Sequence, residues 1–171
     1  MPDPVRDEEF RAFYERMDVR ARRTARRLVG NETTAEDIAA EALARAYARW
    51  TQVRDHPNPD AWLLRVVGNL AIDHVRRRGR TVTHEIEDRA GSDRPDDAAV
   101  LHVDLARAVH PLSHRQQEVV VMRYLVDLSE DEVATTLGMS NGSVKTHLSR
   151  ASSRLRDHLS ELEVISSEAD R

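Results

Sequence analysis

The sequence predicts an all-α protein of two small helical domains, joined by an acidic flexible linker, with a helix-turn-helix in the second domain. Three observations support this prediction. Aromatic residues make up only 4% of the 171 residues, and glycine and proline are scarce, which favours helix over sheet. Apolar residues recur at helical spacing through most of the chain. Residues 79–98 interrupt this pattern with a polar, acidic stretch that contains Gly, Ser and Pro, and they are the expected linker.

The first domain, predicted at residues 7–78, begins with two amphipathic helices. The first spans 7–29 and a glycine ends it. The second opens with a capping box, in which the Thr33 hydroxyl and the Glu36 carboxylate satisfy free backbone amides, and it runs to about Trp50. The inward-facing residues expected on these two helices are Phe10, Phe13, Tyr14, Met17, Ala21, Leu28, Ile38, Ala42, Leu43, Ala46, Tyr47 and Trp50.

A third helix starts at Asn58-Pro59, because proline is tolerated at the first helical position, and is expected to end near Arg78. His74 falls on its apolar side and is expected to be a packed core histidine. The residues of that side are Leu63, Leu64, Val66, Val67, Leu70, Ala71 and Val75. At about 100° per residue, the opposite side brings together Arg65, Asn69, Asp73 and Arg76.

The second domain, predicted at residues 99–162, begins with a short helix at 99–109. Ser113 and Gln116 then form a capping box for a helix that runs to about Leu125. The buried residues expected on this second helix are Val119, Val120, Met122 and Leu125.

Residues 128–155 are typical of a helix, a three-residue turn and a second, basic helix. Ser129 and Glu132 form a capping box, and Gly138 supplies the backbone freedom that the end of the first helix needs. Ser140 is placed to cap the second helix. A small residue, a glycine and a β-branched residue at positions 134, 138 and 144 suit the tight crossing of a helix-turn-helix. The outward face of the second helix carries Asn141, Ser143, Lys145, Thr146, His147, Arg150 and Arg154.

The net charge of −4 is unusual for a DNA-binding protein, but the charges are segregated. Arginines gather between residues 20 and 27 and between 76 and 80, whereas acids gather at 36–41 and 85–97. Screening confines each field to about 10 Å, so local patches decide the attraction to phosphate. Of the 26 basic residues, only Lys145 is a lysine. The acidic total argues against tight non-specific DNA binding and indicates a protein that meets DNA with a partner.

Several classes of function are disfavoured. The chain has no cysteine, and Pro111 interrupts the helix that ligand spacing between His110 and His114 would need, so no metal site is expected. No phosphate-binding glycine loop or catalytic constellation is present, and we expect neither an enzyme nor a cofactor. The acidic N-terminus and the lack of an 18-residue apolar run predict a cytoplasmic protein without membrane insertion.

Three segments together resemble a known family. They are AEDIAAEALARAYARW at 35–50, DAWLLRVVGNLAIDHVRRRGR at 60–80 and LSHRQQEVVVMRYLVDLSEDEVATTLGMSNGSVKTHLSRASSRLR at 112–156. In this order, across an acidic linker, they resemble the extracytoplasmic-function (group 4) sigma factors of bacterial RNA polymerase, in the sigma-70 family. The resemblance extends from about Phe10 to Leu159.

The resemblance implies a subunit that docks on core RNA polymerase and supplies promoter recognition. It implies contacts with the β′ clamp helices through Asp37, Glu41 and Arg45, with the β flap, and with promoter DNA. Ala40 stands where family members often carry glutamine, so one polar contact with the clamp is absent. The resemblance also implies regulation by an anti-sigma factor, and a linker that threads the active-site channel of the polymerase.

The same resemblance assigns two sets of DNA-binding residues. The −10 element, read as a melted strand, would be contacted by Arg65, Asn69, Asp73, Arg76, Arg77 and Arg78. The −35 element, read as a duplex in the major groove, would be contacted by Arg115, Asn141, Ser143, Lys145, Thr146, His147, Arg150 and Arg154. Asparagine can donate to and accept from a base, while arginines neutralise phosphates.

Two alternatives stay open at this point. A LuxR-type helix-turn-helix regulator would bind duplex DNA on its own, and residues 144–147 fit its recognition helix equally well. An adaptor that uses the helices only for protein contacts would leave the basic face of 141–154 unexplained.

Overall fold

The computed structural model describes the backbone of residues 4–85, 109 and 111–169, and the side chains of 5–78, 109 and 111–157. Within these ranges every regular element is a helix, as predicted. In chain order they are α1 (Pro4–Val29), α2 (Glu32–Ala48), α3 (Trp50–Arg54), α4 (Pro59–Glu85), α6 (His114–Val120), the π-helix η1 (Val121–Leu125), α7 (Glu130–Leu137) and α8 (Asn141–Ala169). Among these helices, none combines the length and apolar character that crossing a membrane requires.

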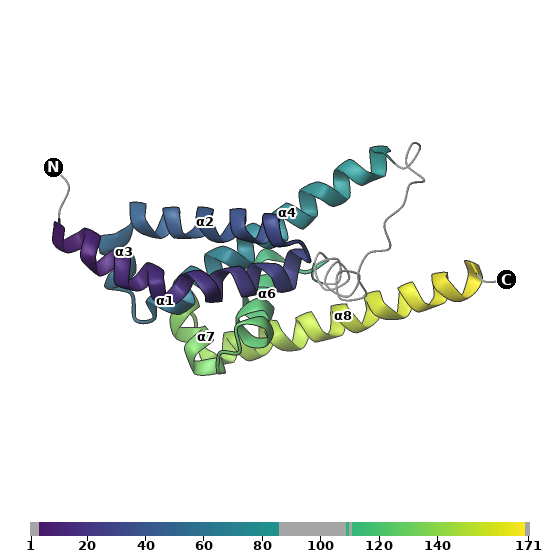
Figure 1. Cartoon of the computed structure of the whole chain (residues 1–171). Coiled ribbons are helices and arrows are strands. Elements are labelled where there is room, and N and C mark those ends of the chain that lie inside the picture. Colours follow the sequence, from purple (N-terminus) through teal and green to yellow (C-terminus); the bar gives the residue numbers. More distant parts are fainter. Residues whose placement is uncertain (1–3, 86–108, 110, 170–171) are drawn as a thin grey trace.

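The first helical cluster, α1 to α4, packs three long helices side by side, with the short α3 near the start of α1 (Figure 1). Fully buried side chains from each long helix form its core, among them Met17, Leu43 and Leu63. At the α3 end, the ring of Phe10 lies edge-on to that of Trp50, with the centroids 5.3 Å apart. The amphipathic pattern of the sequence therefore places the long helices correctly.

The start of α2 differs from the prediction. Asn31 is the N-cap, because its Oδ1 accepts a hydrogen bond from the Thr34 amide at 2.9 Å, and the helix begins at Glu32. Gly30 has a φ of 68°, which turns the chain directly from α1 into α2 and brings Asn31 to the capping position. The predicted capping box between Thr33 and Glu36 is therefore wrong.

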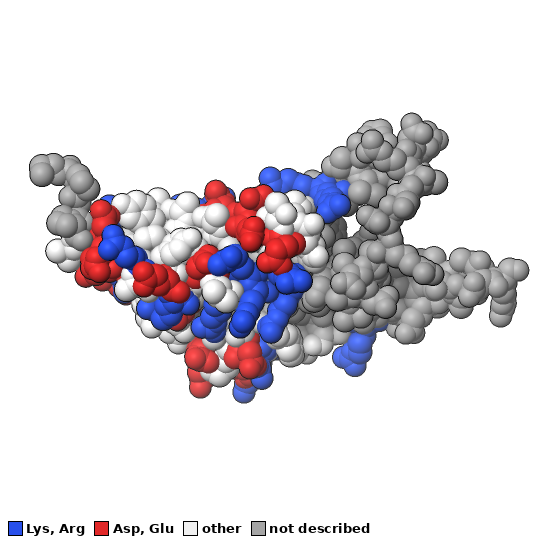
Figure 2. Space-filling view, viewed as in Figure 1, with Lys and Arg blue, Asp and Glu red and all other residues white. Residues whose placement is uncertain are grey.

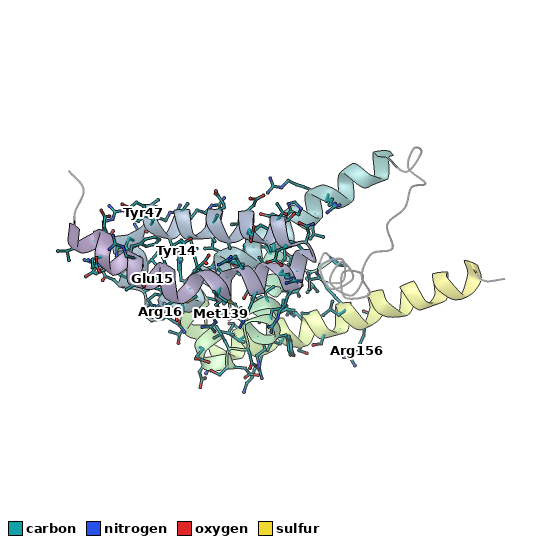
Figure 3. All side chains as sticks on the ribbon, viewed as in Figure 1. Tyr14, Glu15, Arg16, Tyr47, Met139 and Arg156 are labelled. Carbon is teal, nitrogen blue, oxygen red and sulfur yellow. The ribbon has the colours of Figure 1, made fainter. Side chains whose placement is uncertain are left out.

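Two tyrosines that we expected to face inward are exposed, Tyr14 by 44% and Tyr47 by 41% (Figure 3). The Tyr47 hydroxyl donates a hydrogen bond to Asp7 at 2.8 Å, and the guanidinium of Arg6 lies over the ring. The hydrogen bond to Asp7 raises the pKa of Tyr47. A tyrosine on the edge of an apolar face can bury its ring and still hold a polar partner, and periodicity alone does not reveal this.

The helix α4 begins as predicted but ends later. Pro59 is its first residue, and Asn58 Oδ1 accepts a hydrogen bond from the Ala61 amide at 3.0 Å. The helix then continues past the expected end at Arg78 to Glu85, because a single glycine in a helix costs only about 1 kcal/mol and no proline lies between residues 79 and 85. The start of the predicted linker, 79–98, is thus helical. Its remainder, and the helix predicted at 99–109 except Val109, lie outside the described residues.

The second helical cluster comprises α6, η1, α7 and α8. The capping box of Ser113 and Gln116 is present at the start of α6, as predicted. The π-helix η1 follows directly, with the Val126 amide donating to the Val121 carbonyl at 3.1 Å, and this wider turn was not predicted. The four residues predicted to be buried here are buried: Val119, Val120, Met122 and Leu125.

The two clusters pack against each other, because α4 contacts both α6 and η1. Arg27 of α1 also donates a hydrogen bond from Nη1 to the Leu125 carbonyl at 3.1 Å. Buried side chains of both clusters form one continuous apolar core. The sequence predicted two domains connected by a linker and gave no indication of this contact.

Candidate nucleic-acid interface

The geometry of α7 and α8 is set by three local features, all predicted. Ser129 Oγ accepts from the Glu132 amide at 3.3 Å, while Glu132 Oε2 accepts from the Ser129 amide at 2.8 Å. Gly138 has a φ of 62°, and Ser140 Oγ accepts from the Ser143 amide at 3.1 Å. The hydrogen bonds from the backbone and hydroxyl of Ser129 lower the pKa of Glu132, so this carboxylate stays charged at neutral pH. These caps fix where each helix of the helix-turn-helix begins.

Small and β-branched residues bring α7 and α8 close together. Ala134 and Val144 are buried where the helices cross, and Ala151 is buried further along α8. Met139 is half-buried against the core in the turn (Figure 3), and its amide donates to the Ala134 carbonyl at 3.0 Å. The face of α8 opposite these residues consequently points away from the core.

The outward face of α8 is largely open to solvent. Lys145, Thr146 and Arg150 are exposed, while Ser143 and His147 are half-buried. The Thr146 hydroxyl donates to the Gly142 carbonyl at 2.8 Å, which fixes its orientation. This face therefore presents an ammonium, a guanidinium, hydroxyls and an imidazole, which are groups that bind base edges or phosphates in a major groove.

Three of the predicted duplex-binding residues donate hydrogen bonds to side chains of α6 or α7. Asn141 donates its side-chain amide to Asp131. Arg154 Nη1 donates to Gln116 Oε1 at 3.3 Å. Arg115 Nη1 donates to Glu118 Oε2 at 2.9 Å. These residues flank the open part of α8 and are held against α6 and α7.

The predicted −10 residues on α4 divide into two groups. Asp73 and the arginines Arg76, Arg77 and Arg78 are exposed. Figure 2 shows basic side chains where α4 projects from the bundle, beside acidic ones at the start of α2. Arg65 and Asn69, by contrast, face the second cluster. The prediction placed Arg65, Asn69, Asp73 and Arg76 on one face of this helix, and the structure covers the N-terminal half of that face.

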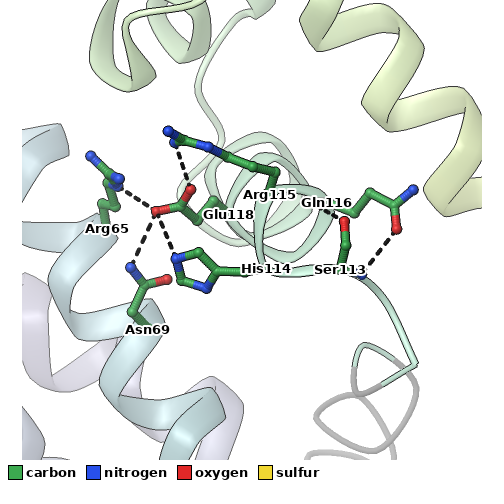
Figure 4. Close-up of polar contacts among 7 residues, drawn as sticks. All are labelled: Arg65, Asn69, Ser113, His114, Arg115, Gln116 and Glu118. Carbon is green, nitrogen blue, oxygen red and sulfur yellow. Dashed lines mark hydrogen bonds and ion pairs between the residues drawn. The ribbon is translucent and has the colours of Figure 1, made fainter.

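Glu118 of α6 binds both covered residues (Figure 4). Its Oε1 accepts from Arg65 Nε at 2.7 Å and from Asn69 Nδ2 at 3.3 Å, and it lies 3.5 Å from His114 Nε2. The Glu118 side chain has no exposed surface. Burial by itself raises the pKa of Glu118, but the hydrogen bond and charge of Arg65, with Asn69 and His114, outweigh it and lower the pKa. Glu118 is therefore a buried, charged carboxylate.

The predicted polymerase-binding residues lie together on α2. Asp37, Glu41 and Arg45 are exposed one turn apart, and Arg45 Nε pairs with Glu41 Oε1 at 2.8 Å. Asp37 and Glu41 also line a small open depression of about 220 Å³ together with His74 and Arg77 of α4. Burial, with the nearby charges of Arg78 and Arg77, lowers the pKa of His74, which is half-buried.

Sequence reasoning missed Glu118 and the neighbouring Gly68. Glu118 stands directly before the apolar run of residues 119–122, and an acid beside such a run is a signal for a buried, paired charge. Gly68 stands in the middle of an otherwise apolar helix, where a glycine often marks a close approach of another backbone or side chain.

Among the described residues, no group of three or more acids and histidines is placed to hold a metal ion.

Comparisons with known proteins cover both clusters. The family model for Sigma-70 region 2 matches residues 13–81, and that for Sigma-70, region 4 matches residues 102–155. The RNA polymerase sigma-E factor of Streptomyces coelicolor is 37% identical over 155 residues, which are 88% of this chain and 86% of that protein. The ECF RNA polymerase sigma factor SigL of Mycobacterium tuberculosis is 34% identical over 161 residues, 91% of each chain.

A solved structure has the same fold. The sigma factor RpoE of Bartonella quintana, in complex with the anti-sigma factor NepR, superposes with a TM-score of 0.56 at 25% identity, over 90% of this chain and 98% of that one. CnrH, in complex with the cytosolic domain of CnrY, gives a TM-score of 0.55 at 24% identity, over 91% and 90%.

Proposed function

Because the chain belongs to the extracytoplasmic-function sigma factors of the sigma-70 family, we propose that its two helical clusters direct core RNA polymerase to promoters by reading two DNA elements. The observation that carries the proposal is the combination of an exposed, basic α8 in a helix-turn-helix with an α4 that bears Asn69 and the exposed arginines Arg76, Arg77 and Arg78. The first cluster would correspond to the domain at 7–78, and the second to the domain at 99–162.

The first cluster would read the −10 element with α4. An extruded base could use both the donor and the acceptor of Asn69, while Arg65, Arg76, Arg77 and Arg78 neutralise phosphates of the melted strand. Asp73 stands beside them. Unstacking one base costs a few kcal/mol, which binding in such a pocket offsets without any covalent step. The polymerase then performs the catalysis.

The second cluster would read the −35 element as a duplex. Ser143, Thr146, His147 and Arg150 are the candidates for contacts with base edges or adjacent phosphates. Arg115, Asn141, Lys145 and Arg154 would act as phosphate anchors around them.

The exposed face of α2 would bind the β′ clamp helices of core polymerase through Asp37, Glu41 and Arg45, and the second cluster would contact the β flap. An anti-sigma factor is a further proposed partner, supported by the solved relative bound to one. A location in the cytoplasm, on the nucleoid when bound to polymerase, follows from the proposed activity.

The decisive experiment is run-off transcription with purified core polymerase on fragments of the source genome, with and without the protein. We expect discrete new transcripts that Asn69→Ala or Arg150→Ala abolishes. Asn69→Ala should leave binding to core polymerase intact, which separates loss of DNA reading from loss of assembly. No transcripts and no co-elution with core, together with tight binding to a palindromic duplex, would contradict the proposal. That outcome would favour the LuxR-type regulator, which neither matching family model describes.

A further inference from the structure

The side chain of Asn141, the first residue of α8, is oriented by α7. Its Nδ2 donates a hydrogen bond to Oδ1 of Asp131, an exposed residue in the first turn of α7. An amide has two N–H groups and one oxygen, so this bond leaves Oδ1 and the second N–H for a ligand. Asp131 also fixes which way the amide faces, because turning it over would place its oxygen against the carboxylate.

The charges around Asn141 favour a neutral ligand over a phosphate. Glu130 and Asp131 are neighbours in the first turn of α7. The Nζ of Lys145 lies 3.8 Å from Glu130 Oε2, whereas the bond from Asn141 brings no positive charge to Asp131. A phosphate bound to Asn141 would lie close to the Asp131 carboxylate and be repelled by it. The edge of a base carries no net charge and avoids this cost.

Gly142, the next residue, leaves open space that the fold does not require. The nearest atom to a Cβ added there is Ser140 Oγ at 3.9 Å, an ordinary contact. Gly142 is helical and exposed, and the glycines with a positive φ are Gly30 and Gly138. Alanine at this position would favour the helix more. A close approach by a group from outside the chain accounts for the glycine.

The free edge of Asn141 matches one base better than the others. Adenine presents the N6 donor and the N7 acceptor side by side in the major groove, whereas guanine presents two acceptors. Cytosine offers a donor alone, and thymine an acceptor beside a methyl group. An amide oxygen next to an N–H is complementary to adenine. Recognition helices of helix-turn-helix proteins contact base edges with their N-terminal residues, which is where Asn141 stands.

We propose, on the basis of the function proposed above, that Asn141 reads an adenine of the duplex element through its Oδ1 and its free N–H. Asp131 is the positioning residue that holds the amide in this orientation, and Gly142 permits the close approach of the base pair. The inference gives Asn141 a base edge in place of the phosphate assigned to it above. Without Asp131 the amide turns freely and offers its N–H groups to guanine as well.

The contact is tested with base analogues. Duplexes selected from a random library by the protein bound to core polymerase, or by the protein alone if it does not bind core, supply the probes. Each adenine is replaced in turn by purine, which lacks the N6 amino group, or by 7-deazaadenine, which lacks N7. At one adenine, each analogue should weaken binding by the wild type about tenfold. Asn141→Ala should bind the adenine and analogue duplexes at that position equally.

Two results overturn the contact. One is an affinity of the wild type that no analogue changes at any adenine. The other is that a methylphosphonate, which removes the charge of one phosphate, weakens the wild type but not Asn141→Ala, while the base analogues affect both proteins alike. Asn141 would then be a phosphate anchor.

The positioning role of Asp131 is tested with all four base pairs at the adenine position. The wild type should prefer adenine to guanine about tenfold, and Asp131→Ala should lower this preference to less than about threefold. Asp157→Ala is the matched control, because it removes an exposed acid about 24 Å further along α8, at a rise of about 1.5 Å per residue. It should keep the preference. An equal gain in affinity for all four base pairs in Asp131→Ala, with the preference intact, overturns the positioning role.

The close approach is tested with Gly142→Ala. This variant should melt at a higher temperature than the wild type, because alanine favours the helix, and should bind the selected duplexes about tenfold more weakly. Unchanged binding overturns the approach at Gly142, and selection of no duplex overturns the whole inference. A protein that gives no run-off transcripts refutes the proposed function instead, while the analogue measurements on the selected duplexes still decide this inference.

Discussion

The polar faces of α4 and α8 have similar chemistry but opposite surroundings. On α8, Lys145, Thr146 and Arg150 are exposed. On α4, Arg65 and Asn69 are bound by Glu118, although Asp73 and the arginines that follow are exposed. One proposed reading surface is therefore available in the free chain, and half of the other is occupied. The difference teaches that a polar helix face identifies a surface able to bind, while long-range packing decides whether it is free.

The largest expected effect is the loss of stability when a buried ion pair at α4 is broken, compared with the loss when an exposed ion pair at α8 is broken. Glu118→Ala should lower the free energy of unfolding by about 3 kcal/mol, because it leaves the partly buried Arg65 without its partner. Glu130→Ala, which removes the exposed partner of Lys145, should cost less than about 1 kcal/mol. Urea unfolding followed by circular dichroism measures both. Equal losses would show that the two faces do not differ energetically.

The second prediction concerns the open face. Arg150→Ala should weaken binding of the holoenzyme to its duplex −35 element about tenfold, since a good contact to a base is worth about 1–3 kcal/mol. Ser153→Ala, an exposed change further along α8, is the control and should have no effect. Fluorescence anisotropy with promoter duplexes obtained from the run-off assay gives the affinities. An unchanged affinity for Arg150→Ala would remove that residue from the recognition face.

The third prediction uses pH to test the charge of Glu118, which covers Arg65 and Asn69 on α4. The folded pKa of Glu118 is lowered from its usual 4.5, so its contribution to stability is complete above that value and is lost as the pH falls through the lowered pKa. Glu118→Gln should therefore reduce the loss of stability between about pH 5 and about pH 3. Urea unfolding of both proteins at a series of pH values measures it. Parallel pH profiles would mean that other carboxylates dominate the acid sensitivity.

The smallest expected effect concerns the caps that begin the two helices. Ser140→Ala and Asn58→Ala each remove one capping hydrogen bond and should each lower the free energy of unfolding by about 1 kcal/mol. Only Ser140→Ala should also weaken duplex binding, because it loosens the turn of α8 that carries Ser143 and Thr146. Loss of duplex binding in Asn58→Ala would show that the two faces are coupled even in the holoenzyme.

Local features were predictable where the interacting residues are close in sequence. The capping boxes at Ser113 and Ser129 and the left-handed Gly138 each depend on partners three or four residues away, and all three were predicted correctly. The start of α2 was missed because Asn31 and Thr33 are both good N-caps. The choice between them was made by the positive φ of Gly30, which the sequence does not specify.

The covered half of α4 was not predictable in the same way. The hydrogen bond between Arg65 and Glu118 joins residues 53 positions apart, and the periodicity of each helix is correct without it. The sequence showed that Arg65 and Asn69 share a polar face, and it contained both Glu118 and Gly68. It contained no information on whether the linker lets these elements meet, so the packing of the two clusters had to come from the structure.

The amine of Lys145 makes α8 chemically different from every other basic surface of the chain. It is the only lysine in the sequence, it is exposed, and its Nζ lies 3.8 Å from Glu130 Oε2. Acetylation removes the charge of a lysine, whereas guanidinium groups remain charged. One acetyl group on this nitrogen would thus neutralise a cation on the helix that we propose to bind the duplex, and it would leave all the arginines of α4 charged. Covalent modification would therefore weaken phosphate binding by α8 and leave the charge of α4 unchanged.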